Sequence, residues 1–391
     1  MRIKHVQVDV VDLDRLNSLF VRIETDTGLI GTGETVLKRR DATVEANIKE
    51  IASYLLGKDP LPIEDHFEKL YRDTFWVGGP MHAAGRSAVD MALWDIKGQF
   101  YQAPIYQMLG GPTRDRVPVY AHAGASSPER LAASLNALVE RGYRAAKVGL
   151  PWFYGGRDAA PDDPWRSIGF GDRSLKETEL VPTRMFAMAA AYFEAARDAV
   201  GWDFELMVDC HGRLNLANAV RLSDALAPYK LLFIEEPLPP ESATEFARLS
   251  ARSVTPIAAG ERLASLYDVR PYLEQGALGV LQCDLANCGG FTGAKKIAAL
   301  AEAYMVPFAP HNPNGPIATL AAAHLMMAIP NALLLETGGG ETEAAVFADA
   351  VDHPPAIADG YLSLDDRPGL GAALLPDVAQ RRPRGTYTAT R

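Results

Sequence analysis

Three acidic residues recur at equal spacing, and each follows a short apolar run. They are Asp209, Glu235 and Glu261, with a step of 26 residues from each to the next. If the fold brings them together, their negative charges repel one another strongly unless a cation lies among them. Carboxylate oxygens select a hard cation, Mg²⁺ before Mn²⁺. One acid at a strand end is commonly a helix N-cap, but three in the same register favour a metal site.

The same rhythm continues further along the chain. Asp284, His311 and Glu336 each follow an apolar run, at steps of 23, 27 and 25 residues. Each gap holds one helix-like pattern, so the unit is a strand, a polar residue at its C-terminal end and a returning helix. Such units form parallel strands with right-handed crossovers. Because an open doubly wound sheet reverses its strand order, six successive strand ends at one centre indicate a (β/α) barrel and its catalytic face.

Two histidines and a lysine are placed to move protons or stabilise charge. Asp284 ends the strand before the loop of His311, and a carboxylate there would orient the imidazole and raise its basicity. His211 lies two residues after Asp209, so on an extended strand both side chains point into the barrel mouth. There His211 can protonate a leaving hydroxyl. Lys147 ends the second strand and can supply positive charge, pair with a ligand acid, or do both.

The other six histidines are expected to be structural, with two exceptions. His122 ends the first barrel strand, and His82 lies in a glycine-rich loop that could cover the site. Both are therefore candidate substrate contacts.

Length and composition restrict the class of protein. A chain of 391 residues suits a barrel plus a smaller domain. Its net charge of −10 disfavours nucleic acid or an anionic membrane as partner. The N-terminus leads into an alternating strand and lacks the apolar core of a signal peptide. We expect a cytoplasmic protein with three reduced structural thiols, Cys210, Cys283 and Cys288.

A smaller α+β domain is expected ahead of the barrel. Alternating apolar residues predict three strands, the last two joined as a hairpin at Thr27-Gly28. The loops 14–19 and 75–82 are candidate covers for the active site, although plain surface turns are an equal alternative. The expected strands are 3–11, 19–24 and 30–34, and the expected helices are 43–56, 63–71 and 86–101.

The barrel is expected to begin near residue 117. A strand over 117–122 and a helix over 128–141 precede the second strand, 145–149. The irregular segment 151–182 is far longer than the usual βα loop. Because it hangs from the catalytic face, we interpret it as a substrate or subunit-contact loop. A helix over 183–200 follows it.

These motifs, taken as a set, resemble the enolase superfamily, and within it the acid-sugar dehydratases of the mandelate racemase subgroup, galactonate dehydratases above all. The residues that carry the resemblance are Lys147, Asp209-Cys210-His211, Ile234-Glu235-Glu236-Pro237, Gly260-Glu261-Arg262, Asp284, Gly289-Gly290, His311 and Glu336, with the segments 26–34 and 92–98.

The resemblance implies a fold and a cofactor. The fold is a modified TIM barrel, (β/α)7β, with an α+β N-terminal capping domain completed by the C-terminal tail. The implied divisions are 1–115 for the capping domain with its lid loops, 116–350 for the barrel, and 351–391 for the returning segment. The implied cofactor is one Mg²⁺ held by Asp209, Glu235 and Glu261. We also expect a homo-oligomer.

One departure from the subgroup pattern indicates the reaction. Racemases of this family carry Lys-x-Lys on the second strand, whereas the position two after Lys147 is Gly149, which has no titratable group. Racemisation needs a base on each face of the substrate. Dehydration needs one base and one acid, here His311 and His211. Glu336 is expected to hydrogen-bond the substrate carboxylate or the enediolate, and its protonated acid is one form that could do so.

We therefore expect a Mg²⁺-dependent hydro-lyase that removes the proton alpha to a sugar-acid carboxylate and yields a 2-keto-3-deoxy acid. A galactonate-like aldonate is the expected substrate. Three alternatives stay open: a mannonate-type dehydratase, a cycloisomerase or lactone-processing enzyme on the same scaffold, and a non-catalytic sugar-acid binding protein. Mannonate dehydratases lack an acid where Asp284 stands.

Overall fold

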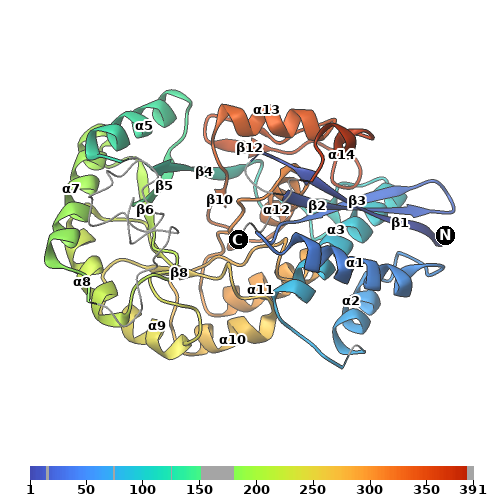
Figure 1. The fold of residues 1–391 in the computed structure, drawn as a ribbon, viewed down its shortest axis with the longest axis horizontal. Helices are drawn as coiled ribbons and strands as arrows, with labels where there is room; N and C mark the ends of the chain where they lie inside the picture. The colour runs from blue at the N-terminus through green and yellow to red at the C-terminus, as the bar shows by residue number, and fades with distance from the viewer. Residues whose placement is uncertain (15–16, 74, 125, 151–179, 385–391) are drawn as a thin grey trace, which may run out of the picture.

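The computed structural model describes most of the chain. The described residues are 1–14, 17–73, 75–124, 126–150 and 180–384. The predicted substrate or subunit-contact loop over 151–182 therefore lies almost entirely outside the described residues. Figure 1 shows a part of the molecule ringed by helices, with the N-terminal strands beside it.

A three-stranded antiparallel sheet opens the chain. Its strands are hydrogen-bonded in the order β1-β2-β3. The predicted hairpin is confirmed: β2 and β3 are antiparallel neighbours, and Gly28 at φ 86° makes the tight turn between them. The bounds are β1 (Ile3–Asp12), β2 (Asn17–Thr25) and β3 (Ile30–Thr35).

Helices pack against this sheet and complete the N-terminal part. Helix α3 begins at Pro80, ahead of the expected start at Arg86. Proline is well tolerated at a first helical position because the N–H that it lacks has no partner within the helix there, and Gly79 at φ 82° turns the chain into it. The bounds are α1 (Asp41–Leu55), α2 (Ile63–Arg72), α3 (Pro80–Tyr101) and α4 (Ile105–Met108).

Parallel strands follow the predicted repeat. Strands β4 to β9 pair in chain order, and β10 pairs in parallel with β4. The predicted seventh strand is reduced to single bridges from Phe308 to Leu281 and to Ala332, since Pro307 and Pro310 lack the N–H that a ladder needs. The bounds are β4 (Val117–Gly124), β5 (Ala145–Gly149), β6 (Glu205–Asp209), β7 (Ile234–Glu235), β8 (Ile257–Ala259), β9 (Val280–Leu281) and β10 (Leu335–Glu336).

The helices between these strands form the outer ring of Figure 1. Four of them begin at a serine or asparagine whose side-chain oxygen accepts a backbone N–H of the first turn. The bounds are α5 (Pro128–Glu140), α7 (Thr183–Val200), α8 (Leu216–Leu226), the 3-10 turn η1 (Ala227–Tyr229), α9 (Ala243–Ser250), α10 (Leu266–Glu274), α11 (Gly290–Ala303) and α12 (Pro316–Ala328).

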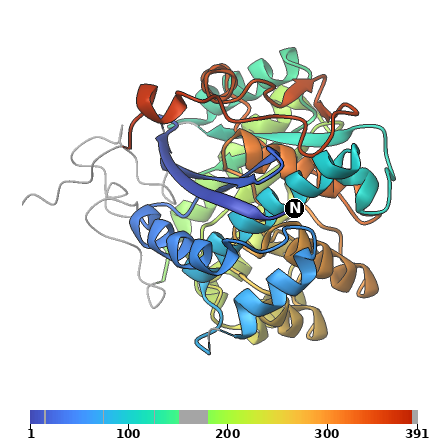
Figure 2. The same ribbon diagram turned by 90° about the vertical axis from the view of Figure 1, so that its right-hand side faces the viewer.

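The C-terminal segment runs back to the N-terminal sheet, as Figure 2 shows in red and blue. Strand β12 pairs antiparallel with β4. Further on, Pro383 bridges Val11, and the Asp12 N–H donates to the Arg382 carbonyl at 3.2 Å. The bounds are α13 (Glu341–Ala350), β11 (Ala356–Ala358), β12 (Tyr361–Ser363) and α14 (Val378–Arg381).

One hydrophobic core joins the two parts. Val11 and Phe20 of the N-terminal sheet, and Leu13 just beyond β1, belong to the same buried cluster as residues of the parallel strands and their helices. A second cluster fills the space between the N-terminal sheet and its helices. A third, smaller cluster includes Tyr120 of β4 and Phe233, which directly precedes β7. The chain thus buries apolar surface continuously from one part into the other.

The state of the cysteines and the character of the helices can be compared with what the sequence predicts. All three cysteines are buried and free, as predicted. No helix in the described ranges combines the length and the apolar character needed to cross a membrane.

Candidate active site

Acidic side chains stand at the C-terminal ends of neighbouring parallel strands. Asp209 ends β6, Glu235 ends β7 and Glu336 ends β10. Glu261 lies two positions beyond the end of β8. Because parallel strands share a direction, all four acids lie at one edge of the sheet.

Lys147 lies among three of these acids, buried on β5. Its Nζ is 2.8 Å from Glu235 Oε1, 2.8 Å from Glu336 Oε1 and 3.5 Å from Asp209 Oδ2. Burial alone would lower the pKa of Lys147, but the surrounding carboxylates raise it well above its usual value. The lysine is therefore a fixed ammonium.

His211 reaches the site by a turn. The prediction that the strand extends through His211 is wrong, because β6 ends at Asp209 and His211 has φ 50°. Its N–H donates back to Asp209 Oδ1 at 2.9 Å, which closes the turn. The imidazole still meets the acid, with Nδ1 3.0 Å from Asp209 Oδ1. Burial would lower the pKa of His211, but Asp209 raises it above its usual value.

The charged form of Glu235 is only partly offset by its neighbours. Its Oε1 accepts from Lys147, and its Oε2 accepts from Gln282 Nε2 at 2.8 Å. Burial, then the nearby carboxylates of Asp209 and Glu336, raise the pKa of Glu235 to about 8. One ammonium among three acids leaves a deficit of positive charge at this point.

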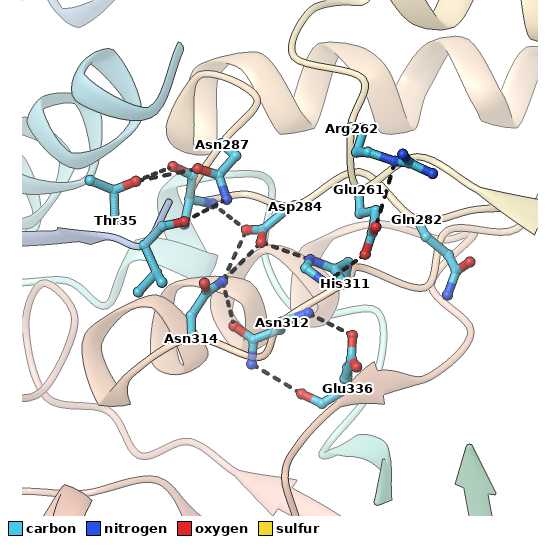
Figure 3. A network of polar contacts seen from close by, with 12 residues as sticks. Thr35, Glu261, Arg262, Gln282, Asp284, Asn287, His311, Asn312, Asn314 and Glu336 are labelled. Carbon is cyan, nitrogen blue, oxygen red and sulfur yellow. Dashed lines mark hydrogen bonds and ion pairs between the residues drawn. The ribbon is translucent and has the colours of Figure 1, made fainter. Parts of the chain in front are cut away.

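His311 lies between two carboxylates, as Figure 3 shows. Its Nδ1 is 2.9 Å from Asp284 Oδ2, and its Nε2 is 2.9 Å from Glu261 Oε2. Burial would lower the pKa of His311, but Glu261 and then other acids hold it well above its usual value. The charged imidazole in turn lowers the pKa of Glu261 to about 2, against the effect of burial. The dyad expected from the sequence is thus in hydrogen-bond contact.

Two asparagines on the same loop hold the acids in place. Asn314 Nδ2 donates to both Asp284 oxygens, at 3.0 and 3.1 Å. The Asn312 N–H donates to Glu336 Oε2 at 2.9 Å, and its side chain donates to the Glu336 carbonyl at 3.0 Å. Sequence analysis missed both, as well as Gln282. The signal that could have found the asparagines is the proline-rich loop Pro310-His311-Asn312-Pro313-Asn314-Gly315-Pro316, whose restricted backbone directs its amides inward.

Glu336 is a carboxylate in this arrangement. It accepts from Lys147, from the Asn312 N–H, and from His122 Nε2 in a short contact. Burial would raise the pKa of Glu336, but Lys147 and His311 hold it well below its usual value. The protonated form considered from the sequence does not fit this arrangement, because three donors already point at the two oxygens of Glu336.

The two remaining histidine candidates differ. His122 reaches the site through Glu336 and is a third exposed. His82 lies on α3, where burial and then Arg86 lower its pKa and Glu50 acts in the opposite direction. The structure thus brings only His122 to the candidate site. In the loop ahead of α3, the side chains of Phe75 and Trp76 are 81% and 84% exposed.

The donor set of this site suits a hard divalent cation. Among the described residues, no group of three or more histidine, cysteine, aspartate or glutamate side chains is arranged to hold a metal ion. Asp209, Glu235 and Glu261 instead contact Lys147, Gln282 and histidines. Their oxygens are nevertheless the ligands that Mg²⁺ prefers. The raised pKa of Glu235 marks where further positive charge would be stabilised.

Two family models match the chain in its two parts. The model described as the mandelate racemase/muconate lactonizing enzyme N-terminal domain matches residues 2–110. The model described as enolase C-terminal domain-like matches residues 130–378.

Relatives and solved structures span nearly the whole chain. It is 37% identical to a D-galactonate dehydratase of Pectobacterium atrosepticum, over 93% of this chain and 90% of the relative. It is 39% identical to that of Ralstonia nicotianae, over 90% and 87%. A crystal structure of an enolase from Pantoea ananatis with bound D-gluconate and Mg superposes with TM-score 0.86 and 30% identity, over 98% and 95%. A member of the enolase superfamily from Salmonella Typhimurium gives 0.89 and 28%, over 98% of each chain.

Proposed function

The chain belongs to the mandelate racemase/muconate lactonizing enzyme family of the enolase superfamily, and on that premise we propose that it is a Mg²⁺-dependent sugar-acid dehydratase. The proposed substrate is a galactonate-like aldonate, and the product is its 2-keto-3-deoxy acid. The observation that carries the proposal is the pair of imidazoles at one site. His311 is held between Asp284 and Glu261, and His211 is held against Asp209.

We propose that Asp209, Glu235 and Glu261 hold the Mg²⁺. Their all-carboxylate chemistry supports this assignment, as does the deficit of positive charge beside Glu235. When bound, the cation supplies charge stabilisation to the substrate carboxylate oxygens. Mg in the Pantoea ananatis structure gives the proposal further support.

His311 is the proposed base. The C2 proton of an aldonate is barely acidic, and its removal puts two negative charges on the carboxylate oxygens. His311 acts in its neutral form, which it would reach once Glu261 binds the cation and releases Nε2. It then takes that proton on Nε2, while Asp284 fixes the ring through Nδ1. Lys147 places a permanent positive charge in the same cluster of strand-end acids.

His211 is the proposed acid. It gives a proton to the C3 hydroxyl as the C3–O bond breaks, so that water leaves and an enol of the 2-keto-3-deoxy acid remains. Glu336 keeps Lys147, His122 and the Asn312 amide in place, a role that its ionised form performs. His122 then faces the substrate hydroxyls as a proposed contact.

Position 149 favours dehydration over racemisation. Gly149 ends β5 and lies in register with Asp209 on β6. A base for the opposite face of the substrate would have to stand at this position, and glycine supplies none. One base and one acid are the set that a hydro-lyase needs.

We also infer that the parallel strands close into a (β/α)7β barrel. Two features support closure: β10 pairs with β4, and the Phe308 bridges span the space between β9 and β10. A closed ring would bring the acid of β10 back to Lys147 on β5, where the 2.8 Å contact places it.

A screen of acid sugars tests the proposal. Purified protein with Mg²⁺ is incubated with a panel of aldonates and aldarates, and 2-keto acid is assayed with and without EDTA. We expect turnover of a galactonate-like aldonate that EDTA abolishes. Silence across the panel would refute the dehydratase. Turnover of mannonate would support the mannonate-type enzyme. Consumption of substrate without 2-keto-3-deoxy acid would support the cycloisomerase or lactone-processing enzyme. Binding of a sugar acid without exchange of its C2 proton would support the binding protein.

A further inference from the structure

The end of strand β3 in the N-terminal domain contacts two loops of the candidate site. The first contact is made by Thr35, whose Oγ1 donates to the Ala286 carbonyl at 2.8 Å. Asn287 Nδ2 returns a hydrogen bond to the Val36 carbonyl at 3.2 Å. Figure 3 shows Thr35 and Asn287 beside Asp284. The loop after β9 is therefore fastened to the N-terminal domain immediately beyond the acid of the dyad.

The second contact is made by Glu34, which is fully buried. Its Oε2 accepts the Ala318 N–H at 2.9 Å, at the start of α12, and Ser18 Oγ donates to its Oε1. A Cβ on Gly315 would lie 1.9 Å from Glu34 Oε1, so the carboxyl group fills the space against that glycine. The loop that carries His311 is thus fastened at its far end.

The two fastened loops determine the geometry of the dyad. Asp284 accepts the Ala286 N–H at 2.8 Å, so the residue that Thr35 holds also fixes the acid. Asn314 bonds Asp284 from the loop that Glu34 holds. In the part of the chain that the structure describes, neither Glu34 nor Thr35 hydrogen-bonds His311 or Asp284 directly. Each acts one residue or one hydrogen bond away from them.

We propose that Glu34 and Thr35 are positioning residues of the dehydration, which hold from the capping domain the two loops that set the Asp284–His311 contact. This inference rests on the proposed function for its kinetic consequence only. A displacement of about 1 Å at a reacting group can lower a rate on the order of 100-fold. The buried Glu34 carboxyl, with its pKa raised to about 7 by desolvation, shows how completely the loop encloses it.

The test at Thr35 uses a hydroxyl deletion with a matched control. Thr35→Val keeps the shape and removes the bond to Ala286, while Thr35→Ser restores it. Thr25→Val removes a similar buried hydroxyl, which bonds the Leu29 carbonyl at the far end of the same sheet. We expect kcat to fall about tenfold or more in Thr35→Val, with KM little changed, recovery in Thr35→Ser, and wild-type kcat in Thr25→Val.

The test at Glu34 uses its neutral isostere. Glu34→Gln keeps an oxygen for the Ala318 N–H and should retain most of kcat. Glu34→Ala leaves that N–H without its acceptor and should lower kcat in the same manner as Thr35→Val.

A second readout separates this inference from the proposed function. Amide hydrogen exchange in 284–287 and 311–318 should speed up in Thr35→Val and Glu34→Ala but not in Thr25→Val, with the strands of the N-terminal sheet unaffected. Unchanged exchange in these loops overturns the inference, whatever the enzyme turns over. Equal loss of kcat in Thr25→Val and Thr35→Val would also overturn it. If the wild-type protein turns over no sugar acid, the proposed function fails. Amide hydrogen exchange in the two loops then still tests whether Glu34 and Thr35 hold them.

Discussion

Lys147 is the residue on which the electrostatics of the site depend. Its ammonium contacts three carboxylates and is almost completely buried. Removing one partner of a buried ion pair leaves the other charge buried without compensation, which typically lowers stability by roughly 3–5 kcal/mol. We therefore expect Lys147→Met to lower the free energy of unfolding by about that amount in metal-free buffer, measured by urea denaturation.

An exposed lysine provides the control for that experiment. Lys69 pairs with Asp65 at 2.6 Å on the surface of α2, where solvent screens the charges. Lys69→Met should change the urea midpoint little. If the two variants lost the same stability, the buried cluster would not depend on Lys147.

The two histidines should separate proton removal from loss of water. His311→Asn removes the proposed base, so both dehydration and exchange of the C2 proton with deuterated solvent should fall on the order of 10²–10⁴-fold. His211→Asn removes the proposed acid only, so dehydration should fall while C2 exchange continues. The measurement is ¹H NMR of the substrate in D₂O beside a 2-keto acid assay. Exchange retained in His311→Asn and lost in His211→Asn would reverse the two assignments.

At the scale of residues, sequence predicts charge better than hydrogen bonds. The strand-end acids could be found because spacing along the chain maps directly onto a shared sheet edge. Gln282, Asn312 and Asn314 could not, because an amide on a loop has no preferred partner until the loop conformation is fixed. The ionised state of Glu336 depends on Lys147, His311 and His122 together, and these residues meet only in the folded chain.

At the scale of elements, the contact between β3 and α3 is a backbone-to-backbone one. A Cβ on Gly33 would lie 1.8 Å from the Ala88 carbonyl oxygen, and one on Gly31 would lie 2.0 Å from that of Ala92. Gly33→Ala must push the helix off the sheet, so we expect a loss of about 1–3 kcal/mol or more in unfolding free energy.

Gly340→Ala is the matched substitution. Its Cβ would meet its nearest neighbour at 3.9 Å, an ordinary contact. Urea unfolding of both variants should therefore show a clear shift for position 33 and almost none for position 340. Equal midpoints would mean that α3 and β3 can separate without cost.

Helices and strands could be predicted from the sequence where a periodic apolar pattern ends at a residue that favours a turn. The helix over 183–200 and the strand over 145–149 match the structure at both ends, since each has a strong apolar pattern bounded by a turn residue. The start of α3 was missed because alanine, glycine and histidine in 82–85 give no apolar stripe. The turn at His211 was missed because a positive φ at a non-glycine residue leaves no mark in the sequence.

At the scale of the whole molecule, acids buried between the two parts link folding to pH. Asp90 on α3 is the clearest case, since its Oδ1 accepts the Thr292 N–H of α11 at 3.1 Å. Its Oδ2 is buried without a hydrogen-bond partner among the described residues. A Cβ on Gly290 would lie 2.4 Å from Asp90 Oδ1, so the carboxyl group is enclosed by the adjoining helix.

The sign of the pH effect follows from that enclosure. Burial raises the pKa of Asp90 from 3.8 to about 7. Between these values the folded protein keeps the proton that the unfolded chain has lost, so folding takes up a proton. The contribution of Asp90 to the free energy of unfolding therefore falls as pH rises through this window, and it is fully present below it. Above pH 7 the folded protein must bury a charge at Asp90, so this contribution to the free energy of unfolding is lost.

Asp90→Asn should remove this dependence because an amide cannot ionise. Its Oδ1 can still accept from Thr292, so the variant should be folded, less stable than wild type near pH 4 and more nearly equal or more stable near pH 8. The measurement is the urea midpoint of both proteins across that range, with Asp65→Asn, an exposed acid of α2, as control. The difference between wild type and Asp90→Asn should shrink or change sign with rising pH, while the control difference stays flat. A constant difference across the range would show that Asp90 is ionised at every pH in the folded protein, and that the contact between α3 and α11 tolerates a buried charge.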